Sequence, residues 1–129
     1  MRIETELIDD RTAVCRVSGE LDAYTAPELR DALEEVLGAG RAWIIADLKQ
    51  LTYLDSTGLG ILVGTAKKCR QAGGDLSVAS ERRNLLRIFQ ISGTEEILNV
   101  VANVETAQTR LAELDEERAR NGAASGEEA

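Results

Sequence analysis

The stretch Tyr53-Leu54-Asp55-Ser56-Thr57-Gly58-Leu59-Gly60 joins two segments of different periodicity and decides the fold. The apolar run at residues 43–48 precedes it and indicates a buried strand. After it, apolar residues recur with the i, i+3, i+4 spacing of one helix face, at Leu59, Leu62, Val63, Ala66 and Cys69. The stretch is therefore predicted to be a strand-to-helix turn, with Ser56 close to the N-terminus of the helix.

Two roles are open for Ser56 at this position. Unpaired backbone N–H groups and the positive end of the helix dipole favour anionic groups at a helix N-terminus. The Ser56 hydroxyl could cap the helix, or it could carry a phosphate that the helix end helps to hold. Local sequence alone favours the cap, because serine is one of the preferred N-cap residues.

Composition and charge exclude several classes of partner and location. The chain has 129 residues and a formal net charge of −8, which disfavours nucleic acid and anionic membranes, because both are bound through Lys and Arg. No apolar run approaches the ~20 residues of a membrane span, and the N-terminus lacks the apolar core of a signal peptide. We therefore expect a cytoplasmic protein, with Cys15 and Cys69 as buried free thiols.

Enzymatic and cofactor-binding functions find little support in the residue types present. The sequence contains no histidine, so the commonest general base and metal ligand are missing. Residues 58–64 have the pattern GxGxxxG, one residue out of step with the dinucleotide fingerprint, and no Walker A loop occurs. Ser56 also lacks the G-x-S-x-G context of a hydrolase nucleophile. We expect no enzymatic activity, no cofactor and no metal; the glycines are expected to let the helix pack closely on the sheet or to let a partner approach.

The acidic residues are a second group of candidate catalytic side chains. Asp22, Asp47 and Asp55 could pair as acid and base, although solvated loop carboxylates are the commoner case. A phosphoaspartate pocket around Asp9-Asp10 is excluded, because no lysine follows Lys68 to contact the phosphoryl group, and aspartate is an ordinary turn residue.

The remaining periodicity predicts one α/β domain over residues 1–115, followed by a charged, disordered tail over residues 116–129. Its sheet is expected to be mixed, mostly parallel and four- to five-stranded, with an N-terminal hairpin and about four helices. Strands are predicted at 3–8, 13–19, 43–48 and 76–80, and helices at 25–37, 57–72, 82–90 and from 103. Segment 97–101 is compatible with either a short strand or an irregular return.

Local signals mark the helix ends and the neighbourhood of the central stretch. Thr25 and Glu28 have capping-box spacing, and Asn103 is the predicted N-cap of the last helix. Asp22 and Asp55 both follow predicted strands. Because ligand and partner sites gather at the carboxyl ends of parallel strands, these two loops are expected to be neighbours.

The chain resembles the STAS-domain anti-sigma factor antagonists of bacteria over roughly residues 3 to 115. Three segments carry the resemblance at family spacing: Gly19-Glu20-Leu21-Asp22 with Tyr24-Thr25-Ala26-Pro27, then Leu54-Asp55-Ser56-Thr57-Gly58-Leu59-Gly60, and more weakly Phe89-Gln90-Ile91-Ser92-Gly93. Two specific motifs in register over a whole domain are far more informative than the isolated glycine pattern.

The resemblance implies a partner-switching function in a bacterial stress response or in sporulation. The unmodified protein would bind an anti-sigma factor that is also a serine kinase of the histidine-kinase-like ATPase type, and so free a sigma factor. Phosphorylation at Ser56 would release the kinase, and a metal-dependent serine phosphatase would reset the switch. The partner-binding residues implied are Asp22, Tyr24, Asp55, Thr57, Gly58, Leu59 and Gly60, with Thr57 as an alternative phosphate acceptor.

Other functions are compatible with the same fold. A STAS domain can be a scaffold subunit of a larger signalling complex, or an accessory subunit of a lipid-transport ATPase in which the serine is incidental. The first usually carries an extra N-terminal sensory domain, whereas this sequence starts directly at its first strand. A nucleotide-binding or weakly hydrolytic domain is a third alternative. The self-association state stays open, with a weak homodimer as one alternative.

Overall fold

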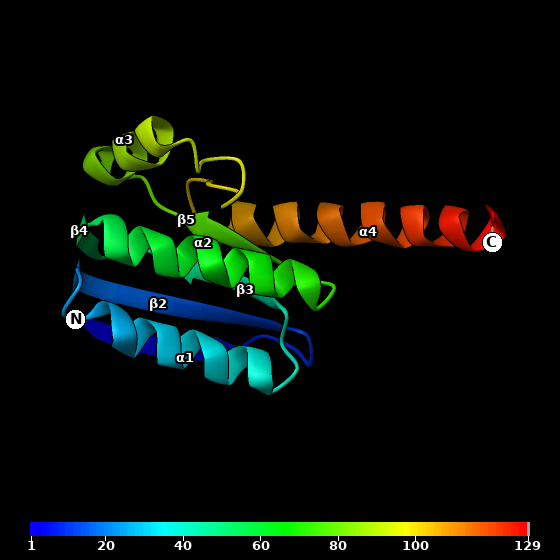
Figure 1. The fold of residues 1–129 in the computed structure, drawn as a ribbon, viewed down its shortest axis with the longest axis horizontal. Helices are drawn as coiled ribbons and strands as arrows, with labels where there is room; N and C mark the ends of the chain where they lie inside the picture. Colours follow the sequence, from blue (N-terminus) through cyan, green and yellow to red (C-terminus); the bar gives the residue numbers. More distant parts are fainter. Residues whose placement is uncertain (129) are drawn as a thin grey trace.

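Strands and helices alternate along the chain in the computed structural model, which describes residues 1–128, with side chains through Asn121. The elements are β1 (Arg2–Leu7), β2 (Thr12–Leu21), α1 (Ala26–Gly38), β3 (Trp43–Asp47), β4 (Leu51–Leu54), α2 (Ser56–Gln71), β5 (Asp75–Ala79), α3 (Arg83–Ser92) and α4 (Val104–Glu128). The predicted α/β class and N-terminal hairpin are confirmed (Figure 1).

The sheet has the order β1-β2-β3-β5, with β4 pairing β2 beyond the end of β3. β1 is antiparallel to β2, and the other pairings are parallel. β2 is long enough to serve two partners in turn: residues 12–16 pair with β3, and residues 19–21 pair with β4. β2 therefore connects the hairpin end of the sheet to the end where β4 leads into α2.

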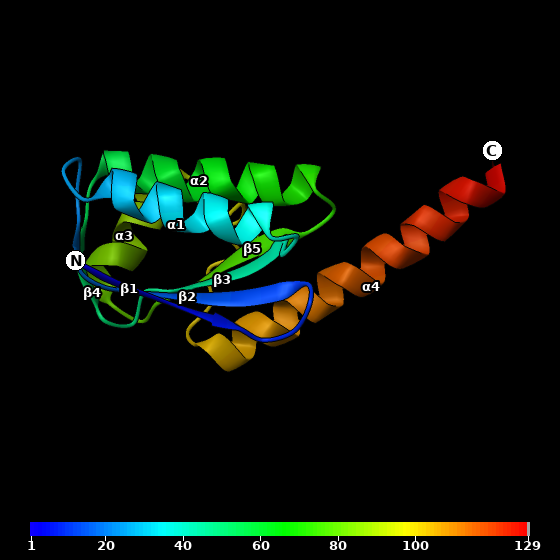
Figure 2. The same ribbon diagram turned by 90° about the horizontal axis from the view of Figure 1, so that it is seen from below.

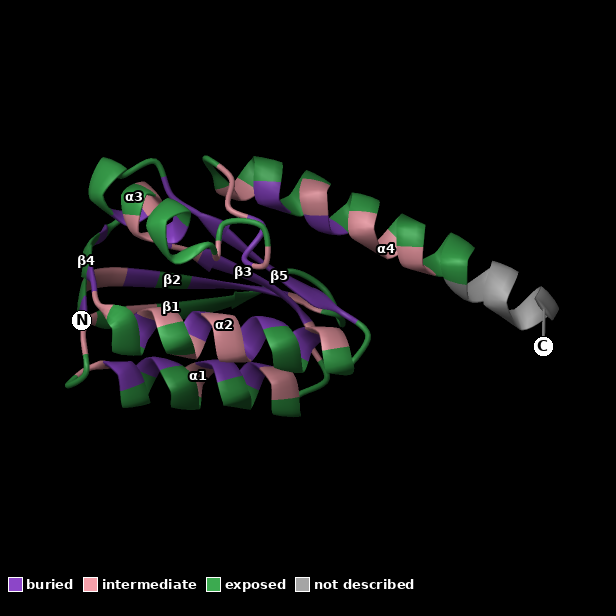
Figure 3. Cartoon of the chain, turned by 45° about the horizontal axis from the view of Figure 1, so that its top comes forward, coloured by how far each residue is buried: buried purple, intermediate pink, exposed green. Residues whose placement is uncertain are grey.

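Helices cover both faces of the sheet, as Figure 2 shows, with α1 and α2 on one side and α4 on the other. The main core lies on the side of α1, α2 and α3, where their buried stripes meet the strands (Figure 3). A smaller cluster joins the opposite face of the sheet to α4 through Val14, Trp43, Ile45, Ala107 and Leu111. Ala107 and Leu111 therefore belong to the face of α4 that packs on the sheet. Within residues 1–128, none of the helices combines the length and apolar character that crossing a membrane requires.

Strand β4 is absent from the sequence-based prediction. Leu51 and Leu54 are buried while Thr52 and Tyr53 are exposed, so the segment lacks the alternation that marks a strand. Its pairing with β2 is non-local: the Gly19 N–H donates to the Gln50 carbonyl at 3.2 Å, beside a shift of register in β2. Tertiary pairing, not local pattern, therefore makes this segment a strand.

The segment at residues 97–101 is an irregular return that covers the outer edge of β5. It forms one isolated bridge, between Ala79 and Val101. The Ser77 hydroxyl donates to the Asn99 carbonyl at 2.7 Å, and the Asn99 amide donates to the Leu76 carbonyl at 2.9 Å. Asn99 has a φ of 46°, in the left-handed region that asparagine tolerates better than most residues. The segment thus hydrogen-bonds to backbone groups on the edge of β5 that would otherwise be unpaired.

The predicted capping box at the start of α1 is wrong. The Thr25 side chain makes no capping hydrogen bond; its hydroxyl donates to the Glu20 carbonyl at 3.0 Å and so belongs to the preceding loop. The prediction for the last helix is confirmed, because the Asn103 side chain accepts from the Thr106 N–H at 2.8 Å. Capping-box spacing indicates only where a cap could form; the loop geometry decides whether it does.

Helix α4 continues past residue 115, where composition predicted the domain to end. Arg118, inside the predicted tail, contacts Asp75, and Asp115 accepts two hydrogen bonds from Arg11 at 3.0 and 3.2 Å. The ordered part of the chain therefore reaches at least to Arg118. A disordered tail beyond that point stays a prediction, and Ala129 lies outside the described residues.

Both cysteines are buried and free, as expected. Burial raises the pKa of the Cys15 thiol to about 11 and that of Cys69 to about 12, so neither forms much thiolate near neutral pH. We expect both thiols to resist a thiol-reactive dye in the native protein at pH 8 and to react fully in urea. Titration with the dye in both conditions measures this; fast labelling of the native protein would contradict it.

Candidate partner-binding site

The site forms where β2 and β4 end side by side. Leu21 and Leu54 are the last paired residues of these parallel strands, so Asp22 and Asp55 leave the sheet at the same place. The Asp55 N–H also donates to the Leu21 carbonyl at 3.1 Å. The expectation that the two aspartate loops are neighbours is confirmed, and its cause is the pairing with the unpredicted strand β4.

Asp55 ties the start of α2 to the loop between β2 and α1. It is the N-cap of α2, with one carboxylate oxygen accepting from the Gly58 N–H at 3.0 Å. Its other oxygen accepts from the Ala23 N–H at 3.0 Å. A carboxylate here also suits the positive end of the helix dipole. One side chain therefore fixes the relative positions of both loops.

Asp22 organises its own loop by a similar arrangement. Its Oδ1 accepts from the N–H groups of Thr25 and Tyr24, each at 3.0 Å, and the Thr25 hydroxyl, which shares its one proton with the Glu20 carbonyl, lies 3.2 Å away. The Thr25 backbone bond is the main cause that holds the pKa of Asp22 below its ordinary value, with smaller contributions from the Thr25 hydroxyl and the Tyr24 N–H. The carboxylate therefore stays charged at neutral pH, and the loop keeps Tyr24 projecting outward, 93% exposed.

Ser56 is the first residue of α2 and is exposed, as is Thr57. The interpretation of Ser56 as the helix cap is wrong, because Asp55 occupies that position. Among the side chains through Asn121, none hydrogen-bonds the Ser56 hydroxyl. Ser56 is thus presented at the helix N-terminus with its hydroxyl accessible from solvent.

The two glycines after Ser56 have different environments. Gly58 is buried, and a Cβ placed on it would lie 2.5 Å from Leu21 Cγ and 2.9 Å from Leu54 Cδ1. Gly60 is exposed, with open space where a Cβ would lie. Close packing of the helix on the sheet is therefore confirmed at Gly58, while Gly60 leaves the helix surface flat. Leu59 is half-buried and packs against the core.

The structure brings most of the predicted site residues to one surface. The Asp22 and Asp55 loops adjoin beside the exposed Ser56 and Thr57, and we call the surface of these four residues the Ser56 surface; Gly58 faces the interior. Sequence reasoning missed Tyr53, which lies on β4 and is 48% exposed. Its place in the quoted stretch was the available signal, but without β4 nothing indicated that its side chain would face solvent. Tyr24 and Tyr53 are thus two exposed aromatic residues in the segments that lead into this surface.

Other acidic candidates do not assemble into a site. Asp47 lies 3.8 Å from Arg16 and accepts from the Lys49 N–H, while Asp9 accepts from the Arg11 N–H as an ordinary turn residue. No cluster of three or more potential metal ligands occurs among the residues that the structure describes. An acid–base pairing of Asp22, Asp47 and Asp55 finds no support, since Asp22 and Asp55 are engaged with backbone N–H groups.

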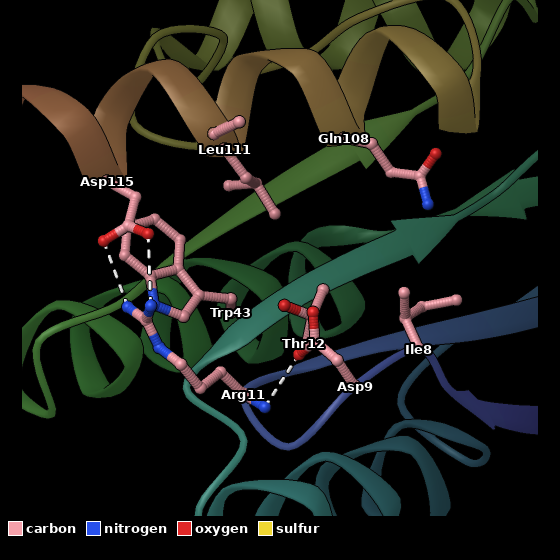
Figure 4. Close-up of a pocket in the computed structure, with 9 residues that line it drawn as sticks. Ile8, Asp9, Arg11, Thr12, Trp43, Gln108, Leu111 and Asp115 are labelled. Atoms are coloured by element: carbon pink, nitrogen blue, oxygen red, sulfur yellow. Dashed lines mark hydrogen bonds and ion pairs between the residues drawn. The ribbon is translucent and has the colours of Figure 1, made fainter.

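A hollow of about 260 Å³ lies at the opposite end of the sheet, between the β1–β2 turn and α4 (Figure 4). The Arg11 side chain crosses it to reach Asp115, with its guanidinium 5.7 Å from the Trp43 ring centroid. Arg11 and Asp115 form an ion pair with each other, so the hollow marks the contact between α4 and the β1–β2 hairpin. The Ser56 surface remains the candidate functional site.

Comparison with known proteins agrees with this geometry. The family model described as STAS domain matches residues 3–107, which cover the strands, except the first residue of β1, and the first three helices. The chain therefore belongs to the STAS domain family.

Its relatives within that family define a narrower group. The chain is 39% identical over 89 residues to the anti-sigma-B factor antagonist of Bacillus subtilis, covering 69% of this chain and 81% of that protein. It is 35% identical over 105 residues to the anti-sigma-B factor antagonist of Staphylococcus aureus, covering 81% and 96%. A crystal structure of an anti-sigma factor antagonist from Mycobacterium paratuberculosis matches with a TM-score of 0.79 and 26% identity, covering 86% and 93%. These relatives are named as regulators, not as enzymes.

Proposed function

We propose that this protein is an anti-sigma factor antagonist that works in the cytoplasm by partner switching. In its unmodified form it binds an anti-sigma factor that is also a serine kinase, and the sigma factor is thereby freed. Phosphorylation of Ser56 releases the kinase, and a metal-dependent serine phosphatase restores the binding form. The observation that carries the proposal is an exposed serine, free of a capping role, at the first position of α2.

The position of Ser56 explains how a phosphate could be accepted without unfolding the domain. A phosphate adds about −1.5 to −2 charges at pH 7. The α2 N-terminus suits such an anion through its dipole and unpaired N–H groups. Asp55 already occupies the Gly58 N–H, so the phosphate would lie beside the cap and would leave it in place.

The same phosphate would oppose a bound partner. It would add bulk and negative charge next to Asp55 and Asp22, on the surface that the kinase has to cover. An unpaired charge buried in an interface costs several kcal/mol, and each 1.4 kcal/mol is a factor of ten in affinity. A local change of charge is therefore sufficient to release the kinase without a large conformational change.

The test is affinity capture from native lysate, followed by reconstitution with the captured kinase. We expect wild type and Ser56→Ala to capture a small ATPase-type serine kinase, and Ser56→Asp to bind this kinase at least tenfold more weakly. With ATP and Mg²⁺ the kinase should add one phosphate, mapped by mass spectrometry to Ser56 and absent from Ser56→Ala. Thr109→Ala is the control, because Thr109 is an exposed hydroxyl residue on α4, outside the proposed binding site, and its removal should leave binding and phosphorylation intact.

Two results would contradict the proposal. Kinase affinity unchanged after enzymatic phosphorylation of Ser56 would remove the charge mechanism, and this test does not depend on aspartate imitating a phosphate. Retention of the same transporter or multi-STAS assembly by wild type, Ser56→Ala and Ser56→Asp would instead identify a scaffold or lipid-transport subunit, in which Ser56 has no regulatory role.

A further inference from the structure

Helix α3 carries a group of arginines that the fold leaves without acidic partners. Arg82, Arg83 and Arg87 are exposed, and none pairs with an acidic side chain among those described through Asn121. Elsewhere the arginines are mostly paired, as at Arg2, Arg11, Arg16, Arg30, Arg70, Arg110 and Arg118. In a chain of net charge −8, a cluster of unpaired positive charge on one short helix needs a separate explanation.

These arginines also work against the stability of the helix that carries them. Arg82 is the N-cap and makes no side-chain capping bond, and the first turn contains no acidic residue. Positive charge is unfavourable at a helix N-terminus, where the dipole is positive. Arg83 and Arg87 are four residues apart, a spacing at which like charges repel. A segment that breaks local rules in this way is expected at a functional surface rather than at a purely structural one.

The exposed face of α3 combines this charge with an apolar residue. Arg83, Arg87 and Ile91 follow at steps of four, so they lie along one side of the helix. Ile91 is 80% exposed, among the most exposed large hydrophobic side chains of the protein. We call these three residues the α3 ridge. The pattern, two positive charges followed by an apolar contact, fits a partner segment that is acidic and carries an apolar side chain.

Helix α3, which carries the ridge, packs on β4, the strand that leads into the Ser56 surface. The Asn84 side chain donates to the Thr52 carbonyl at 3.0 Å, which ties the first turn of α3 to β4, the strand that leads directly into Asp55 and Ser56. In Figures 1 and 2, α3 and the start of α2 lie at the same end of the molecule. A partner that covers Ser56 could therefore extend onto α3.

We propose that the α3 ridge is a second contact surface for the kinase, and that it binds an acidic segment of the kinase with an apolar side chain seated on Ile91. This inference rests on the proposed function and adds a feature of its partner. Because the ridge and Ser56 lie on different helices, we assign affinity and association rate to the ridge and the switch to Ser56. Charges at the rim of an interface act mainly on association rate and its salt dependence.

The test uses the kinase that Ser56→Ala captures, with binding kinetics measured over a range of salt concentrations. Arg83→Glu/Arg87→Glu should lower the affinity about tenfold or more, mainly through the association rate, and should weaken its salt dependence. Lys67→Glu/Arg120→Glu is the matched control, since it changes net charge equally at exposed residues away from the Ser56 end, and should alter affinity less than twofold. Ile91→Ser should weaken binding through faster dissociation.

Stability measurements separate a binding role from a structural one. Because Arg83 opposes the helix dipole and neither ridge arginine has an acidic partner among the described side chains, Arg83→Glu/Arg87→Glu should leave the urea midpoint unchanged or raise it while binding falls. If binding is unchanged in this variant but lost in Ser56→Asp, the ridge proposal is wrong and partner switching stands. An equal loss in the Lys67→Glu/Arg120→Glu control would also overturn the ridge. If wild type and Ser56→Ala capture no kinase, both proposals fail.

Discussion

Asp75→Ala is expected to lower the free energy of unfolding by about 3 kcal/mol, a large effect for a residue far from the candidate site. The Asp75 side chain is 3% exposed and accepts from Arg70 at 3.1 Å, from Arg118 at 2.7 Å and from the Leu76 N–H at 2.8 Å. Removing the carboxylate would leave two arginines and a backbone donor without their partner. About a third of each arginine is exposed, which keeps the cost at the lower end of the range for a broken buried pair.

The same residue holds α4 to the body of the protein. Arg118 belongs to α4, and besides Asp75 it donates to the Gly74 carbonyl. Its guanidinium lies 5.4 Å from the centroid of the Trp43 ring, within the range of a cation–π contact. Loss of Asp75 should therefore loosen α4 around Trp43, the sole tryptophan, and change its fluorescence.

Urea unfolding followed by Trp43 fluorescence and by far-ultraviolet circular dichroism measures the effect. Asp31→Ala is a suitable control, because Asp31 forms an exposed pair with Arg30 at 3.5 Å, and such pairs contribute about 0–1 kcal/mol. If Asp75→Ala lost less than about 1 kcal/mol, the buried carboxylate would contribute no more than such an exposed pair, and its role in holding α4 would be refuted.

Gly58→Ala is expected to destabilise the protein by about 1–3 kcal/mol, although alanine is the better helix former. The added methyl would meet Leu21 Cγ at 2.5 Å, and Cγ is the branch point of the side chain, so a rotation of its far end gives no relief. Leu21 and Leu54 carry the strand ends from which both aspartate loops leave. The substitution should therefore disturb the Ser56 surface as well as the core.

Gly60 provides a matched comparison two residues further along the helix. A methyl group at this position would enter open space, so Gly60→Ala should be neutral or stabilising by up to ~1 kcal/mol. Urea midpoints of the two variants, together with kinase affinity, test the difference. Equal stability of Gly58→Ala and Gly60→Ala would show that α2 can shift away from the sheet without cost.

Much of the candidate site could be predicted from the sequence. The strand-to-helix turn at Ser56, the helix start and the neighbouring Asp22 loop all depend on short-range signals: periodicity, turn residues and the order of elements. The assignment of the helix cap failed because serine and aspartate both cap well and stand next to each other; only the backbone, with Asp55 extended, shows which of them is in the cap position.

Features that depend on long-range contacts were not predictable in the same way. The strand β4 exists because β2 is long enough to pair it after β3 has ended. The exposure of Tyr53 and the place of α3 beside the Ser56 surface follow from that pairing. The ion pair between Asp75 and Arg118 joins residues more than forty positions apart, since Arg118 reaches Asp75 from α4, in a segment whose composition resembles a tail.

The sequence by itself determined the class of fold, the turn that presents Ser56 and the family to which the chain belongs, because each depends on patterns within a few residues. Only the tertiary structure decided that Asp55 caps α2, that Gly58 has no room for a side chain, and that α3 leaves its arginines unpaired. Those features arise where segments distant in sequence contact one another, and local periodicity does not determine the geometry of such contacts.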